Sequence, residues 1–239
     1  MKDYPVQFGG LSSEGKKLVS EKRGRSVLET VKPKTHNQEN AVRLMETKPI
    51  AIVEGLAGTG KTYLAVHYAL KQFLSGKVGR VIFTRPLMNV GNEQLGFLPG
   101  EVDDKTQPYS EQFNEYMEEF LPALSFSEGK KVQRGIEFIP LAHIRGRNFA
   151  NAIIIADEMQ NATSLQMKTL LTRLAEGSQV IVLGDTKQSD RGTKESGLAE
   201  LVRLAKTINS PHIGHVVLGA EDVMRSDVIV DVMRMYGDI

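Results

Sequence analysis

The sequence has no cysteine, no tryptophan and only 6% aromatic residues among its 239. Without cysteine, a disulfide framework, a thiolate metal site and a cysteine nucleophile are all excluded. No apolar run approaches the roughly 20 residues that span a bilayer. The first five residues contain no apolar stretch of the kind found in secretory signals. We therefore expect a cytoplasmic enzyme or binding protein that does not enter a membrane.

The chain also lacks a strong net charge, because 30 Lys and Arg oppose 29 Asp and Glu, for a formal charge of +1. A protein coated in polyanion would carry more positive charge, so any contact with nucleic acid is expected to be local or built by assembly. The 41% apolar content is enough to bury a core at this length. A wholly disordered chain is thereby excluded.

Residues 1–34 differ from the rest of the chain. They hold eight Lys and Arg against four Asp and Glu, and their apolar content is thin. We interpret them as a basic N-terminal extension that is mobile or docks a partner, with a solvated leader that binds nothing as the alternative. Residues 35–239 are then expected to form one domain.

From Thr35 onward, short β-branched runs alternate with segments of helical periodicity. Strands are predicted at 50–53, 80–84, 136–140, 152–156, 180–183 and 216–218, and helices at 37–47, 61–75, 109–121, 165–174, 198–205 and 223–236. Alternating strands and helices predict an α/β fold with a mostly parallel sheet and helices on both faces. Residues 87–108 form an unusually long connection, which indicates a function or an insertion. The aromatic stripe that follows (Tyr109, Phe113, Tyr116, Met117, Phe120 and Leu121) is interpreted as core rather than as a platform for stacking bases.

Residues 55–62, GLAGTGKT, fit the phosphate-binding pattern G-x-x-x-x-G-K-[ST] at every fixed position. They follow a predicted strand and open a predicted helix, as phosphate binding requires. Glycine lets backbone N–H groups approach a phosphate closely, and the helix N-terminus adds unpaired donors and the positive end of its dipole. Lys61 would meet the β- and γ-phosphates, and the Thr62 hydroxyl would bind Mg²⁺. The full nucleotide-binding set predicted here is Gly55, Leu56, Ala57, Gly58, Thr59, Gly60, Lys61 and Thr62.

Two acids, Asp157 and Glu158, directly follow the predicted strand 152–156. The carboxyl edge of an open α/β sheet is where ligands bind. Asp157 is predicted to hold Mg²⁺ through water, and Glu158 to act as general base for the attacking water. A helix cap alone would explain one acid there, but not two beside a phosphate loop.

Two glutamines are further candidates. Gln188, after the fifth predicted strand, is placed to sense the γ-phosphate, with a simple turn capped by Asp185 as the alternative. Gln38 is placed to read the adenine edge, with helix capping by its neighbour Asn37 as the alternative or as an additional role.

Arginine neutralises the charge that develops during phosphoryl transfer. The candidates are Arg85, Arg145, Arg147 and Arg225, each of which taken alone is more commonly a surface residue or an ion-pair partner. The sequence leaves open whether such an arginine reaches its own nucleotide or that of a neighbouring copy.

The ordered motifs resemble the PhoH family of P-loop ATPases, in a short form similar to those carried by phages. The matching segments are GLAGTGKT at 55–62, TRP at 84–86, LGFLPG at 95–100, RGR at 145–147, DEMQN at 157–161, GDTKQ at 184–188 and EDVMRS at 221–226. The last segment departs from the family pattern at Met224 and Ser226. The resemblance covers residues 35–239 and implies a RecA-like P-loop NTPase core related to superfamily-one helicases, with ATP and Mg²⁺ as cofactors and a link to RNA or to phosphate-stress physiology. By position it makes Gln38 the adenine contact, Asp157 and Glu158 the Walker B pair, Gln188 the γ-phosphate sensor and Arg225 a finger or sensor.

Three functions follow from these residues. The first is an ATPase that moves on or remodels RNA or single-stranded DNA. A single core leaves one side of its nucleotide site open, so this function predicts a homo-oligomeric ring in which a neighbouring copy closes the site. The expected size of the ring is a hexamer. The expected location is the cytoplasm, which is that of the host if a phage encodes the protein. The second is an ATP-dependent nucleic-acid-binding switch without unwinding. The third, a kinase, is disfavoured because Glu158 would activate water and waste ATP.

Overall fold

A computed structural model describes residue 28 and residues 30–87, 102–121, 135–189, 196–237 and 239, with only the backbone described for 102–110. Its centre is a six-stranded sheet in the order β3-β2-β4-β5-β1-β6. Every pairing between neighbouring strands is parallel. The strands are β1 (Ile50–Gly55), β2 (Arg80–Thr84), β3 (Ile136–Phe138), β4 (Ala152–Ala156), β5 (Gln179–Gly184) and β6 (Ile213–Leu218). The predicted α/β fold with a parallel sheet is confirmed.

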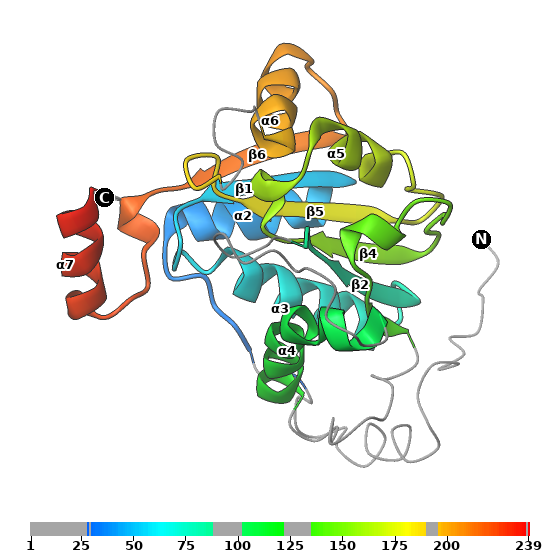
Figure 1. The fold of residues 1–239 in the computed structure, drawn as a ribbon, viewed down its shortest axis with the longest axis horizontal. Helices are drawn as coiled ribbons and strands as arrows, with labels where there is room; N and C mark the ends of the chain where they lie inside the picture. The colour runs from blue at the N-terminus through cyan, green and yellow to red at the C-terminus, as the bar shows by residue number, and fades with distance from the viewer. Residues whose placement is uncertain (1–27, 29, 88–101, 122–134, 190–195, 238) are drawn as a thin grey trace.

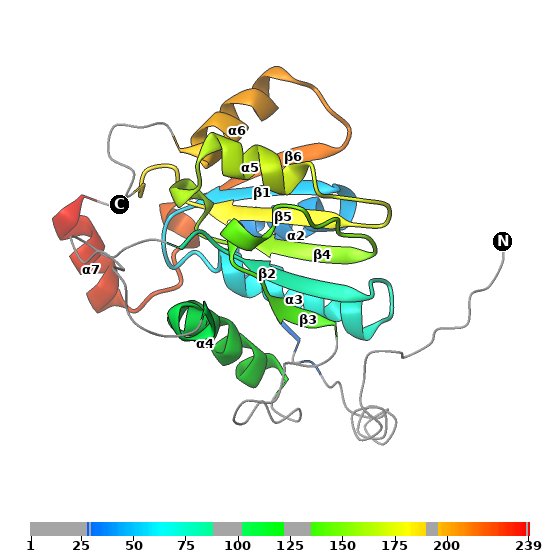
Figure 2. The ribbon, with the colours of Figure 1, turned by 45° about the vertical axis from the view of Figure 1, so that its right-hand side comes forward.

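Helices cover both faces of this sheet (Figures 1 and 2). They are α2 (His36–Thr47), α3 (Lys61–Leu74), α4 (Val102–Phe120), α5 (Ser164–Leu171), α6 (Gly197–Thr207) and α7 (Asp227–Tyr236), with short 3₁₀ turns at Leu141–His143, Met159–Asn161 and Ala220–Asp222. Side chains of α2, α3 and α4 pack in one core against one face, and those of α5 and α6 pack in a second core against the other.

The central strands are apolar because both of their faces are buried. All five residues of β4 are buried, as is the run from Ala51 to Val53 in β1. Continuous Ile and Val runs of this kind are typical of parallel sheets covered on both sides. The chain segments that leave β1, β4 and β5 are therefore carried to the same carboxyl edge of the sheet by a rigid scaffold.

Two helix starts differ from those predicted by four residues or more. Helix α4 begins at Val102, so it includes Pro108, where the long connection was predicted to end. The last helix begins at Asp227 rather than at 223, because Val223 is extended and the Met224 N–H donates to the Gly58 carbonyl at 2.8 Å. The rest of the long connection, 88–101, lies outside the described residues.

The final helix lies apart from the body of the molecule in both ribbon views (Figures 1 and 2). Five of its apolar side chains are exposed, from 42% for Val232 to 82% for Met235, and only Met233 is buried. A helix with a bare apolar stripe is unusual on the surface of a soluble protein.

Candidate nucleotide site

The loop from Gly55 to Lys61 has the backbone that phosphate binding requires. Gly58 and Gly60 have φ angles of +77° and +81°, in the left-handed region that favours glycine. Gly60 is the N-cap residue of α3, so the first N–H groups of that helix face the loop. The phosphate loop follows β1, which ends at Gly55, and precedes α3, which begins at Lys61. The predicted position of GLAGTGKT between a strand and a helix is confirmed.

Lys61 lies inside this loop. Its Nζ donates to the carbonyls of Gly55 and Leu56, both at 2.6 Å. Burial lowers the pKa of the Lys61 ammonium, while the negative charges of Asp157, Asp185 and Glu158 act in the opposite direction. The loop therefore holds one desolvated positive charge among three acids, which is an arrangement suited to a phosphate with a metal ion.

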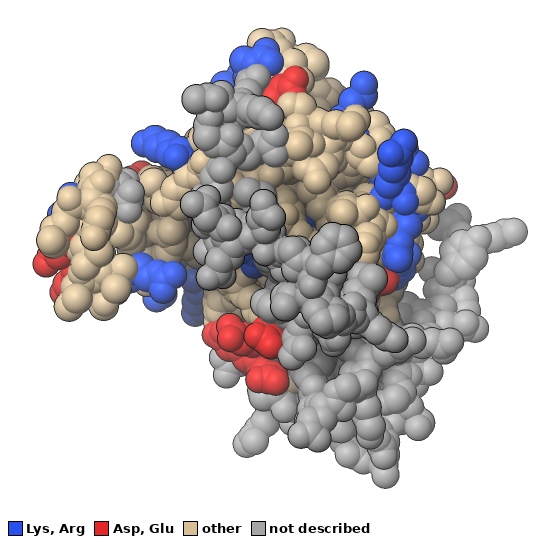
Figure 3. All heavy atoms as spheres, in the orientation of Figure 1, with Lys and Arg blue, Asp and Glu red and all other residues tan. Residues whose placement is uncertain are grey.

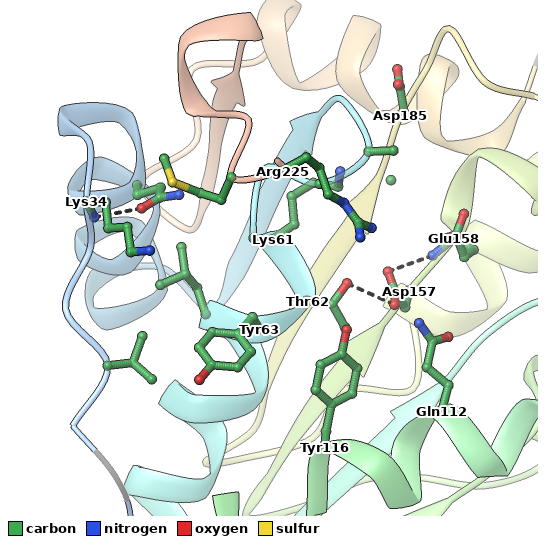
Figure 4. Close-up of a pocket in the computed structure, with 18 of the residues that line it drawn as sticks. Lys34, Lys61, Thr62, Tyr63, Gln112, Tyr116, Asp157, Glu158, Asp185 and Arg225 are labelled. Atoms are coloured by element: carbon green, nitrogen blue, oxygen red, sulfur yellow. Dashed lines mark hydrogen bonds between the residues drawn. The ribbon is translucent and has the colours of Figure 1, made fainter. Parts of the chain in front are cut away.

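The Thr62 hydroxyl and Asp157 are joined directly. Thr62 Oγ1 donates to Asp157 Oδ2 at 3.0 Å, and the Glu158 N–H donates to Asp157 Oδ1 at 2.9 Å (Figure 4). Asp157 is 3% exposed, and burial, followed by the charge of Glu158, raises the pKa of its carboxyl. The two residues predicted to hold Mg²⁺ thus lie together although they are 95 positions apart in the sequence.

Glu158 has a strained backbone and a fixed side chain. Its φ and ψ of 53° and 35° are in the left-handed region, which non-glycine residues seldom adopt outside special sites. Gln160 Nε2 donates to Glu158 Oε2 at 2.5 Å, and Gln160 Oε1 accepts from the Asp185 N–H at 3.2 Å. Gln160 is 3% exposed. It therefore connects the predicted general base to the loop after β5, a role that the sequence analysis missed.

Gln38 is also anchored at both ends of its amide. Its Oε1 accepts from the Lys34 N–H at 2.7 Å, and its Nε2 donates to the Thr59 carbonyl at 3.1 Å. One acceptor lone pair and one N–H of this amide are left for a base. Asn37 does not cap α2. Thr35 does, by accepting from the Gln38 N–H, whereas the Asn37 amide donates to Glu221 and Asp222.

Arg225 extends over the phosphate loop of its own chain (Figure 4). A Cβ added at Gly58 would lie 2.7 Å from Arg225 Cγ and 2.8 Å from its Nε. Arg225 is positioned by the bond between the Met224 N–H and the Gly58 carbonyl. This segment joins the loop to α7, which begins two residues later.

A cavity of about 670 Å³ brings most of the predicted site residues together. Its lining includes Gln38, Ala57, Gly58, Gly60, Lys61, Thr62, Asp157, Glu158, Gln188 and Arg225. It also includes Thr30, Val31, Lys32 and Lys34, so the end of the N-terminal segment forms one wall. Gly55, Leu56 and Thr59 belong to the phosphate loop but do not line the cavity. Arg147 is exposed and does not line the cavity.

The chemistry of this lining fits a phosphate chain and a hard divalent cation. Hydroxyl and carboxylate oxygens, the ligands that Mg²⁺ prefers, are supplied by Thr62 and Asp157. Asp185 Oδ2 is buried at the cavity without a hydrogen-bond partner. Among the described residues, no group of three or more His, Asp or Glu side chains forms a ready-made metal site. A bound Mg²⁺ would then take its remaining ligands from phosphate and water, as is usual at nucleotide sites.

The sequence analysis also missed two residues of α4, Gln112 and Tyr116, and the partner of Arg85. Arg85 Nη1 donates to Gln112 Oε1 at 2.6 Å, and Gln112 and Tyr116 both line the cavity. Tyr116 was predicted as part of a core stripe. Phe113, Met117 and Phe120 of that stripe are buried, but the Tyr116 side chain reaches the cavity (Figure 4). The side chain of Tyr109 lies outside the described residues.

Within the part of the chain that the structure describes, no helix has the length and apolarity needed to cross a bilayer.

The sequence model of the family described as "PhoH-like protein" matches residues 30–237. PhoH-like proteins of Mycobacterium tuberculosis and Bacillus subtilis are both 39% identical to the chain, over alignments that each cover 87% of it. Protein PhoH of Escherichia coli K12 is 34% identical over 97% of it. These alignments cover 58%, 64% and 64% of the three relatives, so the chain spans about three fifths of their length. Among solved structures, the UvsW helicase of bacteriophage T4 aligns over 87% of this chain and 68% of its own, with 14% identity and a TM-score of 0.48.

Proposed function

This chain belongs to the PhoH family, and we propose that it binds ATP with Mg²⁺ in the cavity at the carboxyl edge of its sheet and hydrolyses the terminal phosphate. The observation that carries the proposal is the meeting of a phosphate loop, the Thr62–Asp157 pair and the fixed carboxylate of Glu158 around one cavity. Phosphoryl transfer needs little more than positioning and charge stabilisation, and these groups supply both.

Each residue then has a defined part. Loop N–H groups and the Lys61 ammonium bind the β- and γ-phosphates. The Thr62 hydroxyl and Asp157 would hold Mg²⁺, which neutralises phosphate charge when it is bound. Glu158 accepts a proton from the water whose oxygen bonds to the γ-phosphorus, while the bond between that phosphorus and the bridging oxygen breaks. In this proposal Gln188 and Arg225 contact the γ-phosphate, and Gln38 and the wall at 30–34 contact the base; all of them line the cavity.

The proposal includes a homo-oligomer, with a hexameric ring as the expected form. Two observations support it. The cavity lining includes Arg225, two residues before α7 begins, and α7 itself carries a row of exposed apolar side chains. Exposed apolar surface of this kind marks protein contact sites. Arg147, which is outside its own cavity, can act on a nucleotide only from a neighbouring copy.

Nucleic acid is the proposed partner, as RNA or single-stranded DNA that is remodelled by turnover. The basic segment 1–34 and the exposed arginines Arg145 and Arg147 would supply local positive charge for its phosphates. Acidic side chains gather over α4 (Figure 3), where Glu111, Glu115, Glu118 and Glu119 are all exposed. That surface is unsuited to a polyanion.

The alternative function is a switch that binds nucleic acid without unwinding it, and it uses the same residues. A cytoplasmic location and a phage-type short form remain predictions.

The test is steady-state phosphate release by the wild type and by Glu158→Gln. This variant keeps the shape of the side chain but cannot accept the proton. We expect turnover to fall by about 10²–10⁴-fold, the usual contribution of a positioned base, with the dissociation constant for ATP little changed. Turnover at the wild-type rate in Glu158→Gln would overturn the assignment of the base. Phosphate found on an acceptor other than water would instead indicate a kinase.

A further inference from the structure

We propose that Asp222, the last residue of the 3₁₀ turn after β6, is a positioning residue that holds Arg225 over the phosphate loop by joining its segment to the start of α2. The inference rests on the proposed function, in which Arg225 contacts the γ-phosphate. It assigns a role to a buried carboxylate that does not line the cavity.

The carboxylate of Asp222 is completely buried and accepts three hydrogen bonds. Its exposed fraction is 0%. Oδ1 accepts from the Thr35 hydroxyl, and Oδ2 accepts from the Asn37 amide at 3.0 Å and from the Gly219 N–H at 2.7 Å. A carboxylate that has lost its water is tolerated in a protein interior when such donors replace the water. The three donors therefore fix the position of the turn that carries Asp222.

Two of these donors belong to the start of α2, which is itself fixed. The Thr35 hydroxyl accepts from the Gln38 N–H at 3.2 Å and so caps the helix. Ala41 and Met45 of α2 are 0% exposed, in the core that this helix shares with α3. Asp222 is thus bonded to a rigid element, and the first turn of that element also carries Gln38, the proposed contact to the base.

The other end of the segment lies on the phosphate loop. The Met224 N–H donates to the Gly58 carbonyl at 2.8 Å. A Cβ added at Gly58 would lie 2.7 Å from Arg225 Cγ, so the arginine packs directly on the backbone of the loop. From there its side chain extends into the cavity (Figure 4). Asp222 lies three residues before Arg225, so the bonds to α2 limit the positions that the arginine can take.

This role needs the hydrogen bonds of Asp222 rather than its charge. In Asp222→Asn, the amide oxygen can accept from Asn37 and Gly219, and the NH₂ group can donate to the second lone pair of the Thr35 hydroxyl. In Asp222→Ala all three bonds are lost, and the Gly219 N–H is left without this acceptor. The alanine variant should therefore release the segment, and the asparagine variant should restore it.

The first measurement is amide hydrogen exchange without nucleotide, followed by mass spectrometry. In Asp222→Ala we expect peptides that cover 219–226 to exchange about 10-fold faster than in the wild type, while peptides from β4 and β5 keep their protection. In Asp222→Asn the protection of 219–226 should return to near the wild-type level. This readout does not depend on turnover.

The second measurement is a double-mutant cycle with Arg225→Ala, based on the rate of phosphate release in a single turnover. A misplaced catalytic group can cost a large factor in rate, so Asp222→Ala should slow the otherwise wild-type protein by about 10-fold or more. Where Arg225 is already alanine, the same change should slow release by less than about twofold. A residue that acts through Arg225 has nothing left to position in that background.

The matched control is Ser178→Ala, which also removes hydrogen bonds of a partly buried side chain. The Ser178 hydroxyl accepts from the Ala152 N–H at 3.1 Å and donates to the Phe149 carbonyl at 2.9 Å. It precedes β5 and so lies at the edge of the sheet opposite the cavity. Ser178→Ala should change the rate by less than about twofold, with or without Arg225.

A milder variant covers the case in which Asp222→Ala folds poorly. Asn37→Ala removes one of the three donors and leaves the other two in place. It should shift the exchange of 219–226 and the rate of phosphate release in the same direction as Asp222→Ala, by smaller factors.

Equal slowing by Asp222→Ala in both Arg225 backgrounds would overturn the inference, because that is the result expected of a residue that only stabilises the fold. So would unchanged exchange of 219–226, or an Asp222→Asn variant as slow as Asp222→Ala. If the wild type released no phosphate, the proposed function would fail, whereas the exchange measurement would still show whether Asp222 holds this segment.

Discussion

The side-chain amide of Gln160 donates a hydrogen bond of 2.5 Å to the carboxylate of Glu158. The same amide accepts from the backbone N–H of Asp185, at the start of the loop that carries Gln188. A carboxylate held in this way has one orientation toward the cavity, and that orientation depends on the loop after β5. The proposed base and the proposed γ-phosphate sensor are thereby connected through one buried residue.

Removing this connection should slow turnover more than it weakens binding. In Gln160→Leu, which is similar in volume but makes neither bond, we expect kcat to fall at least about 10-fold, part of the roughly 10²–10⁴-fold that a positioned base contributes. The dissociation constant for ATP should change by less than about threefold. Stopped-flow phosphate release and equilibrium titration measure the two quantities. Gln166→Leu, which removes the acceptor of the Thr163 N–H in the capping box of the nearby helix α5, is the control for general destabilisation.

The contact between Arg225 and Gly58 predicts that this arginine acts on the nucleotide of its own chain. Mixing Lys61→Ala with Arg225→Ala subunits tests the prediction. If Arg225 acts within one chain, no mixed assembly contains a complete site, and ATPase activity should stay at the level of the separate variants. Activity restored by mixing would show that the arginine serves a neighbouring copy instead.

The exposed stripe of α7 predicts the oligomer contact. Val228 and Val232 lie one turn apart and are 71% and 42% exposed. Changing both to Asp should place charge in a buried interface and shift the mass in solution toward the monomer, as measured by light scattering. Arg234→Asp alters the net charge of the same helix by an equal amount and should leave the mass unchanged. An unaltered assembly in Val228→Asp/Val232→Asp would exclude α7 from the contact.

Stability toward acid should depend on Glu54, which joins β1 to β6 and to the loop after β5. Its carboxylate is bonded to His215 Nε2 at 2.9 Å and accepts from the Thr186 hydroxyl. The bond to His215 holds the pKa of the Glu54 carboxyl below its ordinary value of 4.5. Because the pKa is lower in the folded than in the unfolded chain, this stabilisation is complete above about pH 4.5 and is lost as the pH falls through the folded pKa.

Glu54→Gln should therefore lower the free energy of unfolding near pH 7 by roughly 1–2 kcal/mol and flatten its decline below pH 4.5. Urea unfolding at several pH values measures both effects. A parallel decline in the wild type and in the variant would show that Glu54 does not carry this dependence.

Much of the fold was predictable because its signals are local. The apolar run 152–156 gave the bounds of β4, and GLAGTGKT predicted a strand, a loop and a helix in the correct order. The errors lie where a distant contact decides the local structure. Residues 223–226 have helical periodicity, but the Met224 N–H is bonded to the Gly58 carbonyl, and the segment is not helical. Pro108 indicated a boundary, whereas α4 begins at Val102 and continues through it.

The same distinction applies to the site. The Walker-type residues were predictable because their chemistry is encoded in short motifs. Gln160 and Tyr116 were not assigned roles, because their importance depends on which atoms the fold places beside them. A Tyr in an aromatic stripe at helical spacing indicates core packing, and only the fold shows that the Tyr116 side chain reaches the cavity. Such residues are found by following the contacts outward from the motif.

The central claim is that this cavity binds ATP with magnesium, and the most direct measurement is isothermal titration of the purified chain with a non-hydrolysable ATP analogue and Mg²⁺. We predict saturable binding with one nucleotide per chain, and its loss in Lys61→Ala, whose thermal unfolding should otherwise match that of the wild type. Folded wild-type protein that gives no heat of binding, or Lys61→Ala that binds as tightly as the wild type, would contradict the account.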